Sequence, residues 1–242
     1  MLEFTFILPC LNEEKTLPFC IDEIQNYISN NNLNAEILVS DNGSTDNSLI
    51  IAKEKGVRVC NCKNKGYGNA LINGTKNAKG IYCVMGDCDG SYDFSNLDIF
   101  IKKVREGNDL IVGNRFAGGI EKNAMPLSHK IGVKFLSNFS NLLFRTPIKD
   151  YHCGLRMYKT SSIKKIRLSS SGMEYASEMI IKSKINNLKM CEVPTILRKD
   201  LRDKKPHLRT IRDGFRHLFL ILNIYFNKNK YLIINKKVKN KS

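Results

Sequence analysis

Three aspartates lie close together in the stretch "GDCDGSYDF" at residues 86–94, directly after the apolar run "IYCVM". At the end of a buried strand, the carboxylates of Asp87, Asp89 and Asp93 would repel one another unless a positive charge neutralises them. Alternate residues that leave a strand can aim two carboxylates at one cation, and Mg²⁺ is often held by one or two carboxylates together with substrate phosphates. The stretch therefore predicts a clamp for a metal ion and a diphosphate, built from Asp87 and Asp89 with Mg²⁺ or Mn²⁺.

Three other interpretations compete for the same stretch. A calcium loop of the EF-hand type would need its sharp-turn glycine where Tyr92 stands, and it would follow a helix. "DCDGS" also looks like the strand end of a phosphohydrolase with an aspartate nucleophile, but the later chain offers its acidic residues singly rather than as a pair. Asp93 or Ser95 is suited to cap the next helix. We therefore assign Asp87 and Asp89 to the metal and leave Asp93 as a turn or cap residue.

The first half of the sequence contains the elements that would position this clamp. Apolar runs typical of strands occupy 4–9, 35–41, 57–61, 81–87 and 109–114, with helical patterns between them. This alternation predicts an α/β fold with a mainly parallel sheet that is covered by helices on both faces. Ligands of such sheets bind beyond the carboxyl ends of the strands, and here those ends carry the polar sequences "PCLNE", "SDNGSTD", "GDCDGSYD" and "GNRF".

These strand ends could also form a nucleotide site beside the clamp. Asp41 ends a strand, and its carboxylate can accept hydrogen bonds from a ribose or a base edge. Asn12 and Glu13 follow the first strand and are placed to do the same. In "NKGYGNAL" at 64–71, two glycines precede a helix, where backbone N–H groups can approach a ligand.

The second half is less regular. It predicts an amphipathic helix at 129–144, a strand at 152–159, a helix at 172–186, a strand at 189–199 broken by Pro194, and a long helix with a basic face at 207–226. Because no clean linker is visible, we expect one domain over 1–206, with a nucleotide-binding half at 1–115 and an acceptor half at 116–206. Residues 207–242 would form a basic amphipathic helix and tail. No run reaches the roughly 20 apolar residues that span a bilayer.

The net charge of +16 is unevenly distributed. Acidic residues outnumber basic ones in residues 1–100, whereas basic residues dominate the rest of the chain. This asymmetry indicates an anionic partner such as a membrane surface or a phosphorylated substrate. Nucleic acid is disfavoured, because the first half is acidic and no known nucleic-acid module is present. The eight cysteines follow no secretory signal, so we expect reduced thiols in a cytosol, and no second Cys/His pair has zinc-site spacing.

Four stretches of the first half resemble, in order and spacing, the motifs of the inverting family 2 glycosyltransferases, which have the Rossmann-like GT-A fold. These stretches are "ILPCLNEEKTL", "EILVSDNGSTDNS", "NKGYGNAL" and "VMGDCDGSYDF". The later "GNRF", "DYHCGLRMYK" and "GMEYASEM" resemble the branch of dolichol- and polyprenyl-phosphate sugar transferases. The resemblance implies that Asp87 and Asp89 are the DxD pair, with Asp89 in direct contact with the metal, and that Asp41 contacts the base or ribose. The implied nucleotide-sugar site comprises Pro9, Asn12, Glu13, Asp41, Lys65, Gly66 and Asp87.

The acceptor decides which other side chains the reaction needs. A lipid monophosphate has its second pKa at about 6 and is largely ionised at pH 7, so it needs cationic residues rather than a general base. The resemblance and the basic second half favour transfer of a hexose from a UDP- or GDP-linked sugar to a polyprenyl phosphate. The candidate acceptor residues are Arg115, which we also expect to be catalytic, and His129, Lys130, His152 and Arg156.

A sugar hydroxyl in polysaccharide or glycolipid assembly is the alternative acceptor, and it would need a general base. The candidates for that role are Asp150, Glu174 and Glu178. A non-catalytic binding module is disfavoured, because Asp41, Asp87 and Asp89 are all present. We expect a cytoplasmic protein that is peripheral on the inner face of the cytoplasmic membrane, where each nearby Lys or Arg of the basic C-terminal segment contributes about 1 kcal/mol.

Overall fold

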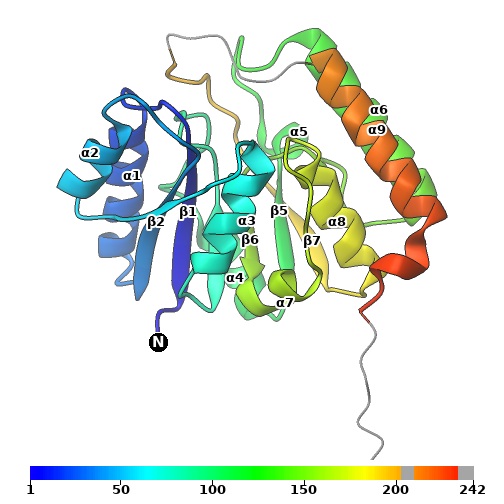
Figure 1. The fold of residues 1–242 in the computed structure, drawn as a ribbon, viewed down its shortest axis with the longest axis horizontal. Coiled ribbons are helices and arrows are strands. Elements are labelled where there is room, and N and C mark those ends of the chain that lie inside the picture. Colours follow the sequence, from blue (N-terminus) through cyan, green and yellow to red (C-terminus); the bar gives the residue numbers. More distant parts are fainter. Residues whose placement is uncertain (203–209, 234–242) are drawn as a thin grey trace, which may run out of the picture.

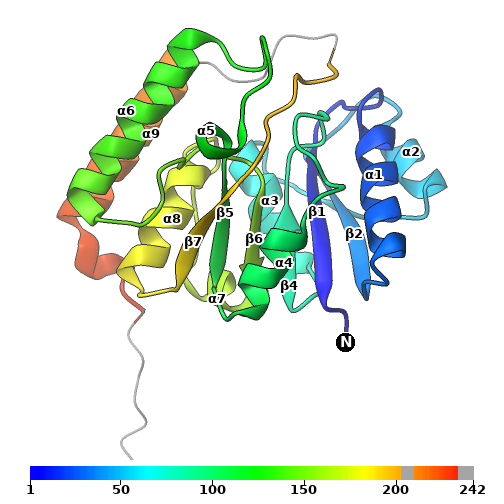
Figure 2. The same cartoon turned by 180° about the vertical axis from the view of Figure 1, so that it is seen from behind.

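The computed structural model describes residues 1–202 and 210–233. A seven-stranded sheet in the order β3-β2-β1-β4-β6-β5-β7 runs through its centre, with helices on both faces (Figures 1 and 2). The strands are β1 (Phe4–Cys10), β2 (Ala35–Asp41), β3 (Arg58–Asn61), β4 (Tyr82–Met85), β5 (Leu110–Asn114), β6 (Arg156–Lys159) and β7 (Met190–Pro194). All neighbours pair in parallel except β6, which is antiparallel to both β4 and β5. The expected α/β fold with a mainly parallel sheet is confirmed.

Helices cover both faces of this sheet, and others lie beyond its β7 edge (Figures 1 and 2). In chain order they are α1 (Leu17–Asn30), α2 (Ser48–Glu54), α3 (Tyr67–Asn77), α4 (Asp98–Arg105), α5 (Arg115–Gly118), α6 (Leu127–Phe144), α7 (Thr160–Lys165), α8 (Tyr175–Ile185) and α9 (Thr210–Phe226), followed by the 3₁₀-helix η1 (Lys228–Tyr231). Helices α1 and α4 lie on one face, where the Tyr27 hydroxyl donates a hydrogen bond to Asp98 (Figure 2). Helices α3 and α8 lie on the other (Figure 1).

The central strands read as continuous apolar runs because helices cover both of their faces. Almost every residue of β1 is buried, and β1 pairs in register with β2 from Phe4 opposite Ala35 to Cys10 opposite Asp41. The parallel register brings the carboxyl ends of β1, β2 and β4 to one edge of the sheet. The antiparallel β6 begins at this same edge, so the residues that precede it also face the site.

The expected strand at 189–199 is shorter in the structure. Strand β7 ends at Pro194, because its partner β5 ends at Asn114, directly opposite. The expected strand at 152–159 begins only at Arg156, since residues 152–155 form a loop at the edge of the sheet. The expected boundary at residue 206 lies outside the described residues.

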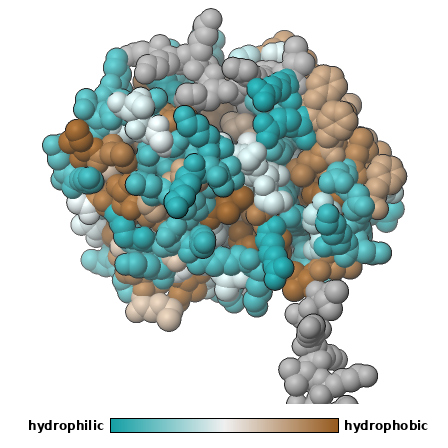
Figure 3. Space-filling model, in the orientation of Figure 1, coloured by the Kyte–Doolittle hydropathy of each residue, from teal (hydrophilic) through white to brown (hydrophobic). Residues whose placement is uncertain are grey.

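Helices α6 and α9 pack side by side beyond the β7 edge of the sheet (Figures 1 and 2). The rings of Phe144 and Tyr225 meet edge to face, with their centroids 6.0 Å apart. Large apolar side chains on the two helices nevertheless stay exposed, and Figure 3 shows apolar surface on this side of the molecule. The exposed side chains, which we call the α6–α9 face, are Leu127, Ile131, Phe135, Leu142, Phe215, Phe219 and Phe226. Within residues 1–202 and 210–233, no helix is long and apolar enough to cross a bilayer.

Candidate active site

A cavity of about 520 Å³ lies at the carboxyl ends of β1 and β4. Its walls come from the end of β1, the start of α3, the aspartate stretch, the loops before α6 and β6, and the segment 197–202. Most of the predicted site residues line it, although they come from distant parts of the chain. These are Pro9, Glu13, Lys65, Gly66, Asp87, Asp89, Arg115, His129, His152 and Arg156.

The two clamp carboxylates both line this cavity. Asp87 Oδ1 accepts a hydrogen bond of 2.8 Å from the hydroxyl of Tyr67. Asp89 Oδ1 accepts hydrogen bonds from the backbone N–H and the hydroxyl of Ser91, at 3.0 and 2.6 Å. Burial, together with the negative charge of Asp89, raises the pKa of Asp87 to about 6. Such crowding of two carboxylates indicates a site that a cation would stabilise.

A protein cation, Arg202, already contacts this pair. Its Nη1 lies 2.9 Å from Asp89 Oδ2, and its Nε lies 2.8 Å from Glu13 Oε1. Its backbone neighbour Leu201 donates a hydrogen bond of 2.8 Å to the carbonyl of Asp89, which fixes the segment against the clamp loop. Sequence reasoning missed Arg202, because it lies more than a hundred residues from Asp89 in a run of basic residues that resembles a solvated surface.

The donor set suits a metal that shares its coordination with substrate. Within the described parts of the chain, no group of three or more His, Cys, Asp and Glu side chains forms a closed metal cage. Two hard carboxylates beside an open cavity instead match the sites of Mg²⁺ and Mn²⁺, in which phosphate oxygens complete the shell. Asp87 and Asp89 are the residues that could hold such an ion.

Two predicted nucleotide residues, Asp41 and Asn12, stand outside the cavity lining. The carboxylate of Asp41 accepts hydrogen bonds from the backbone N–H groups of Gly43 and Ser44, at 2.9 and 3.1 Å. Asn12 Oδ1 accepts a hydrogen bond of 2.7 Å from the backbone of Thr45. Both side chains therefore shape the loop after β2, and their direct contact with a nucleotide stays a prediction.

The glycines at the start of α3 serve a different purpose from the expected one. The N–H of Gly66 donates to Asn42 Oδ1 at 2.6 Å, and the N–H of Gly68 donates to the carbonyl of Ser171 at 3.0 Å. A Cβ on Gly68 would stand 2.1 Å from the carbonyl oxygen of Ser170. We expected backbone N–H groups here to approach a ligand. Those of Gly66 and Gly68 instead bond within the protein, and the two glycines permit close backbone packing. Asn42 lines the cavity and was missed.

Arg115 reaches the cavity wall but is bound within the protein. Its Nε and Nη2 donate to the two oxygens of Asp150 at 2.7 and 2.8 Å, and both side chains are almost completely buried. This bidentate pair uses the fixed fork of the guanidinium. Asp150 is therefore the counter-ion of Arg115.

Arg156 is also held inside the fold. It is fully buried and donates to the backbone carbonyls of Cys153, Ala176 and Tyr151 at 2.9, 2.9 and 2.7 Å. It thus stabilises the loop before β6. Lys130 lies outside the cavity lining.

The other two base candidates are likewise paired with cations. Glu174 accepts from Arg216 of α9 at 2.6 Å. Glu178 pairs with Lys182 at 2.7 Å and accepts the backbone N–H of Ser170 at 2.8 Å. Neither glutamate lines the cavity. The geometry thus gives no support to a general base at any of the three predicted positions.

Three histidines stand on the wall next to α6 and α9. The rings of His152 and His217 meet edge to face with their centroids 4.5 Å apart, and His217 Nδ1 lies 2.8 Å from the hydroxyl of Ser177. Burial lowers the pKa of His129 and of His152, and it lowers that of His217 to about 4. Burial thus disfavours the charged form of these imidazoles, and acceptor binding by His129 and His152 stays a prediction. His217 was missed because its helix reads only as amphipathic and basic.

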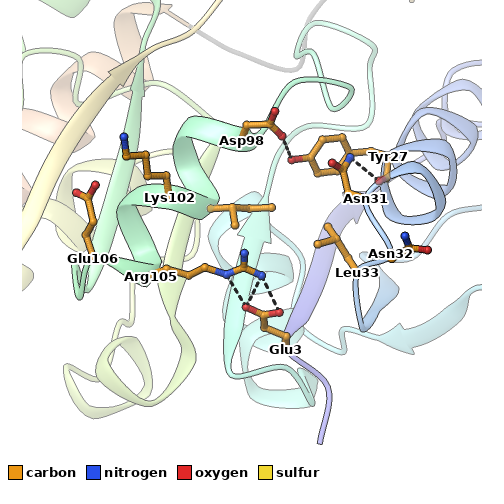
Figure 4. Close-up of a pocket in the computed structure, with 10 residues that line it drawn as sticks. Glu3, Tyr27, Asn31, Asn32, Leu33, Asp98, Lys102, Arg105 and Glu106 are labelled. Atoms are coloured by element: carbon orange, nitrogen blue, oxygen red, sulfur yellow. Dashed lines mark hydrogen bonds and ion pairs between the residues drawn. The ribbon is translucent and has the colours of Figure 1, made fainter.

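A second cavity, of about 630 Å³, lies near the amino end of β1, between the end of α1 and helix α4 (Figure 4). Arg105 pairs with Glu3 there, and the Tyr27 hydroxyl donates to Asp98 at 2.6 Å. No predicted site residue lines this cavity, and these charged and polar groups satisfy one another. The cavity at the strand ends is therefore the candidate active site.

The fold and this site define a glycosyltransferase of the GT-A type. The chain belongs to glycosyl transferase family 2, because residues 5–167 match the sequence profile of that family.

Named relatives support this assignment. The chain is 33% identical over 220 residues to the low-salt glycan biosynthesis hexosyltransferase Agl6 of Haloferax volcanii, which covers 90% of this chain and 52% of Agl6. It is 26% identical over 230 residues to the dolichol-phosphate mannosyltransferase of Pyrococcus furiosus, covering 91% of this chain and 64% of that protein. The chain thus spans about half of Agl6 and under two thirds of the mannosyltransferase.

Among solved structures, glucosyl-3-phosphoglycerate synthase from Mycobacterium tuberculosis resembles the chain. Its complex with Mn²⁺, UDP and glucosyl-3-phosphoglycerate matches 93% of this chain and 80% of its own, with a TM-score of 0.74 and 18% sequence identity. This likeness shows the shared fold.

Proposed function

We propose that this glycosyltransferase moves a hexose from a UDP- or GDP-linked sugar to a polyprenyl phosphate, with inversion and with the help of Mg²⁺ or Mn²⁺. The observation that carries the proposal is the pair of crowded carboxylates, Asp87 and Asp89, in the cavity at the strand ends. The similar mannosyltransferase is named for dolichol phosphate, and the similar synthase was solved with Mn²⁺ and UDP.

In this proposal the metal, when bound, neutralises the charge that develops on the leaving diphosphate. Asp87 and Asp89 would hold the ion, and the Tyr67 hydroxyl orients Asp87 through its hydrogen bond of 2.8 Å. Arg202, which lines the same cavity and contacts Asp89, would direct positive charge toward the diphosphate. Cations aimed at a leaving group lower the barrier, because charge develops there in the transition state.

The pairing of all three base candidates with cations favours a phosphate acceptor over a sugar hydroxyl. Asp150 and Glu174 pair with arginines and Glu178 pairs with a lysine, so each is held as a counter-ion. An ionised phosphate is already a nucleophile at pH 7 and needs no proton removed. Its charge would instead be met by a cationic residue along the cavity, such as Lys65.

A lipid acceptor requires a route from a membrane to the cavity, and we propose that the α6–α9 face provides it. The side chains of Phe135, Phe219 and Phe226 are 62, 69 and 77% exposed, which is unusual for large apolar groups that serve no contact. Lys134 of α6 and Lys228 of η1, which follows α9, are also exposed and would attract anionic headgroups. The proposal makes the protein peripheral on the inner face of the cytoplasmic membrane.

The transfer reaction itself is the first test. Radiolabelled UDP- and GDP-hexoses are incubated with polyprenyl phosphate in vesicles, with Mn²⁺ or with EDTA. We expect labelled lipid only when metal is present, with the anomeric configuration inverted. Asp89→Asn should abolish the transfer. The matched control Asp93→Asn should retain it, because Asp93 lies outside the cavity lining and pairs with Arg198.

Transfer to a free glycan hydroxyl, with no transfer to the lipid from any hexose donor, would instead establish the alternative acceptor. Membrane docking is tested separately by sedimentation with anionic vesicles. Phe135→Ser combined with Phe219→Ser should weaken the binding. The control Phe19→Ser, at a 43% exposed site on α1 on the other side of the molecule, should leave it unchanged. Equal binding of all three proteins would exclude the α6–α9 face as the docking surface.

A further inference from the structure

Two cysteines meet inside the candidate active site. Cys10 is the last residue of β1 and lines the cavity, and Cys88 stands between the clamp residues Asp87 and Asp89. Both cysteines are about 1% exposed. The Cys88 thiol donates a hydrogen bond of 3.0 Å to the carbonyl of Pro9, so its sulfur lies against the peptide bond that joins Pro9 to Cys10.

The sheet brings these two residues together. Strands β1 and β4 are parallel neighbours in which Ile7 pairs with Met85, and Gly86 continues the contact by donating to the carbonyl of Ile7. Strand β4 ends at Met85, and beyond it Cys88 stays close to the end of β1: its thiol contacts the carbonyl of Pro9, and each of the two thiols shifts the pKa of the other. Neighbouring strands are about 4.8 Å apart. A disulfide spans about 4.4–6.8 Å between Cα atoms, so two residues at neighbouring strand ends are within its reach.

We propose that Cys10 and Cys88 are an oxidation site, and that a reversible disulfide between them switches off the metal clamp. The oxidant is a peroxide that enters through the cavity. The sulfur of Cys10 attacks the O–O bond and becomes a sulfenic acid, while one oxygen of the peroxide leaves as water. The sulfur of Cys88 then attacks the sulfenic sulfur, the S–S bond forms, and a second water leaves. Two thiols thus lose two electrons and two protons, and one hydrogen peroxide becomes two waters.

The bond would act on the clamp through the backbone. The two sulfur atoms must come to about 2.05 Å from one another, which draws residue 88 toward β1. Asp87 and Asp89 flank residue 88 directly, so their carboxylates would turn away from a shared cation. A change in the groups that orient metal ligands typically costs about 10- to 100-fold in metal affinity, and we expect a loss of this size. A thiol reductant restores the original contacts.

This inference rests on the proposed function only in calling the clamp a metal site, and its first readout is independent of turnover. The purified full chain is treated with hydrogen peroxide, its remaining thiols are alkylated, and its peptides are analysed by mass spectrometry. We expect a peptide pair linked through Cys10 and Cys88 that disappears after dithiothreitol. Oxidation of other cysteines without this link would overturn the proposal.

The second readout is Mn²⁺ binding, measured by electron paramagnetic resonance with the metal alone. Affinity should fall about 10- to 100-fold after peroxide and return after dithiothreitol. A linked pair with unchanged Mn²⁺ affinity would refute the switch. If the protein proves to transfer no sugar, both readouts still report on the cysteines, so that failure is distinguishable from failure of this inference.

Variants separate this pair from the other cysteines. Cys10→Ser and Cys88→Ser, each compared with its own untreated sample, should lose the response of Mn²⁺ affinity to peroxide. The matched control is the double variant Cys60→Ser with Cys62→Ser, because these two cysteines are more exposed and separated by one residue. It should respond as the wild type does. Loss of the response in this control would assign the switch to residues 60 and 62 instead.

Discussion

Replacing Asp87 with asparagine tests whether the ionised Asp87 carboxylate, which is buried beside Asp89, destabilises the folded protein. Burial, together with the neighbouring carboxylate of Asp89, raises the pKa of Asp87 from 3.8 to about 6. The folded protein therefore binds a proton on Asp87 more tightly than the unfolded chain does. Above about pH 6 the ionised carboxylate lowers the stability of the fold, whereas below pH 3.8 it is protonated in both states and the penalty vanishes. Asparagine removes the charge, and its carbonyl can still accept the hydrogen bond from Tyr67.

The size of the effect follows from the pKa difference. One pKa unit corresponds to about 1.4 kcal/mol, so the shift sets an upper limit of about 3 kcal/mol. Because the carboxylate is only partly screened from the solvent of the cavity, we expect Asp87→Asn to gain about 1–3 kcal/mol in the free energy of unfolding at pH 7.5. For a chain of this size, each 1 kcal/mol corresponds to about 2–4 °C in melting temperature. The same variant should lose metal-dependent transfer.

The measurement is a series of urea and thermal unfolding curves between pH 4 and pH 8, with EDTA present throughout. The stability gain of Asp87→Asn over wild type should be full above pH 6 and should shrink toward zero near pH 4. Asp93→Asn is the control, and it should show no such gain because it removes an ion pair with Arg198. A variant that is less stable than wild type at pH 7.5, or a gain that is the same at pH 4 and pH 7.5, would refute the reasoning.

Three further predictions follow from contacts around the cavity. Arg202→Gln should raise the affinity for Mn²⁺ alone by about tenfold at pH 8, because it frees a clamp carboxylate from a charge-assisted hydrogen bond worth about 1.5–3 kcal/mol. Unchanged affinity in an electron paramagnetic resonance titration would show that this arginine does not compete with the ion. Asp150→Asn should cost about 3–5 kcal/mol in urea unfolding, since it leaves Arg115 buried without its counter-ion, and a loss under about 1 kcal/mol would contradict the buried pair. Gly68→Ala should destabilise the fold by about 1–3 kcal/mol, since its Cβ would overlap a backbone carbonyl. Gly132→Ala, where the Cβ would enter open space on α6, should stabilise the fold by up to about 1 kcal/mol. Equal melting temperatures for these two variants would contradict the packing argument.

The sequence predicted the α/β fold well because its signals are local. The run at 4–9 is apolar throughout, which is typical of a strand that helices cover on both faces, and β1 occupies Phe4–Cys10. Asp87 and Asp89 were also predictable, because two carboxylates one residue apart at a strand end lie in one place in any such fold. The register between β1 and β4 then places them at the cavity.

Long-range partners could not be predicted in the same way. The sequence does not reveal whether the guanidinium of an arginine contacts a ligand or a carboxylate of the protein. Only the fold shows that Arg115 is paired with Asp150. The charge of His152 could not be predicted from the sequence either, because the segments that bury its side chain and lower its pKa, including α9, are distant along the chain.

By itself, the amino-acid sequence determined the family, the order of the strands and helices along the chain, and the position of Asp87 and Asp89 at a strand end, because periodicity and short motifs depend on neighbours within a few residues. The tertiary structure alone decided which charges meet. It brought Arg202 to Asp89, gave each base candidate a cation, and set Cys10 beside Cys88. The physical reason is that ion pairs, burial and the pKa shifts that follow from them depend on distances in space, and the chain folds residues more than a hundred positions apart into contact.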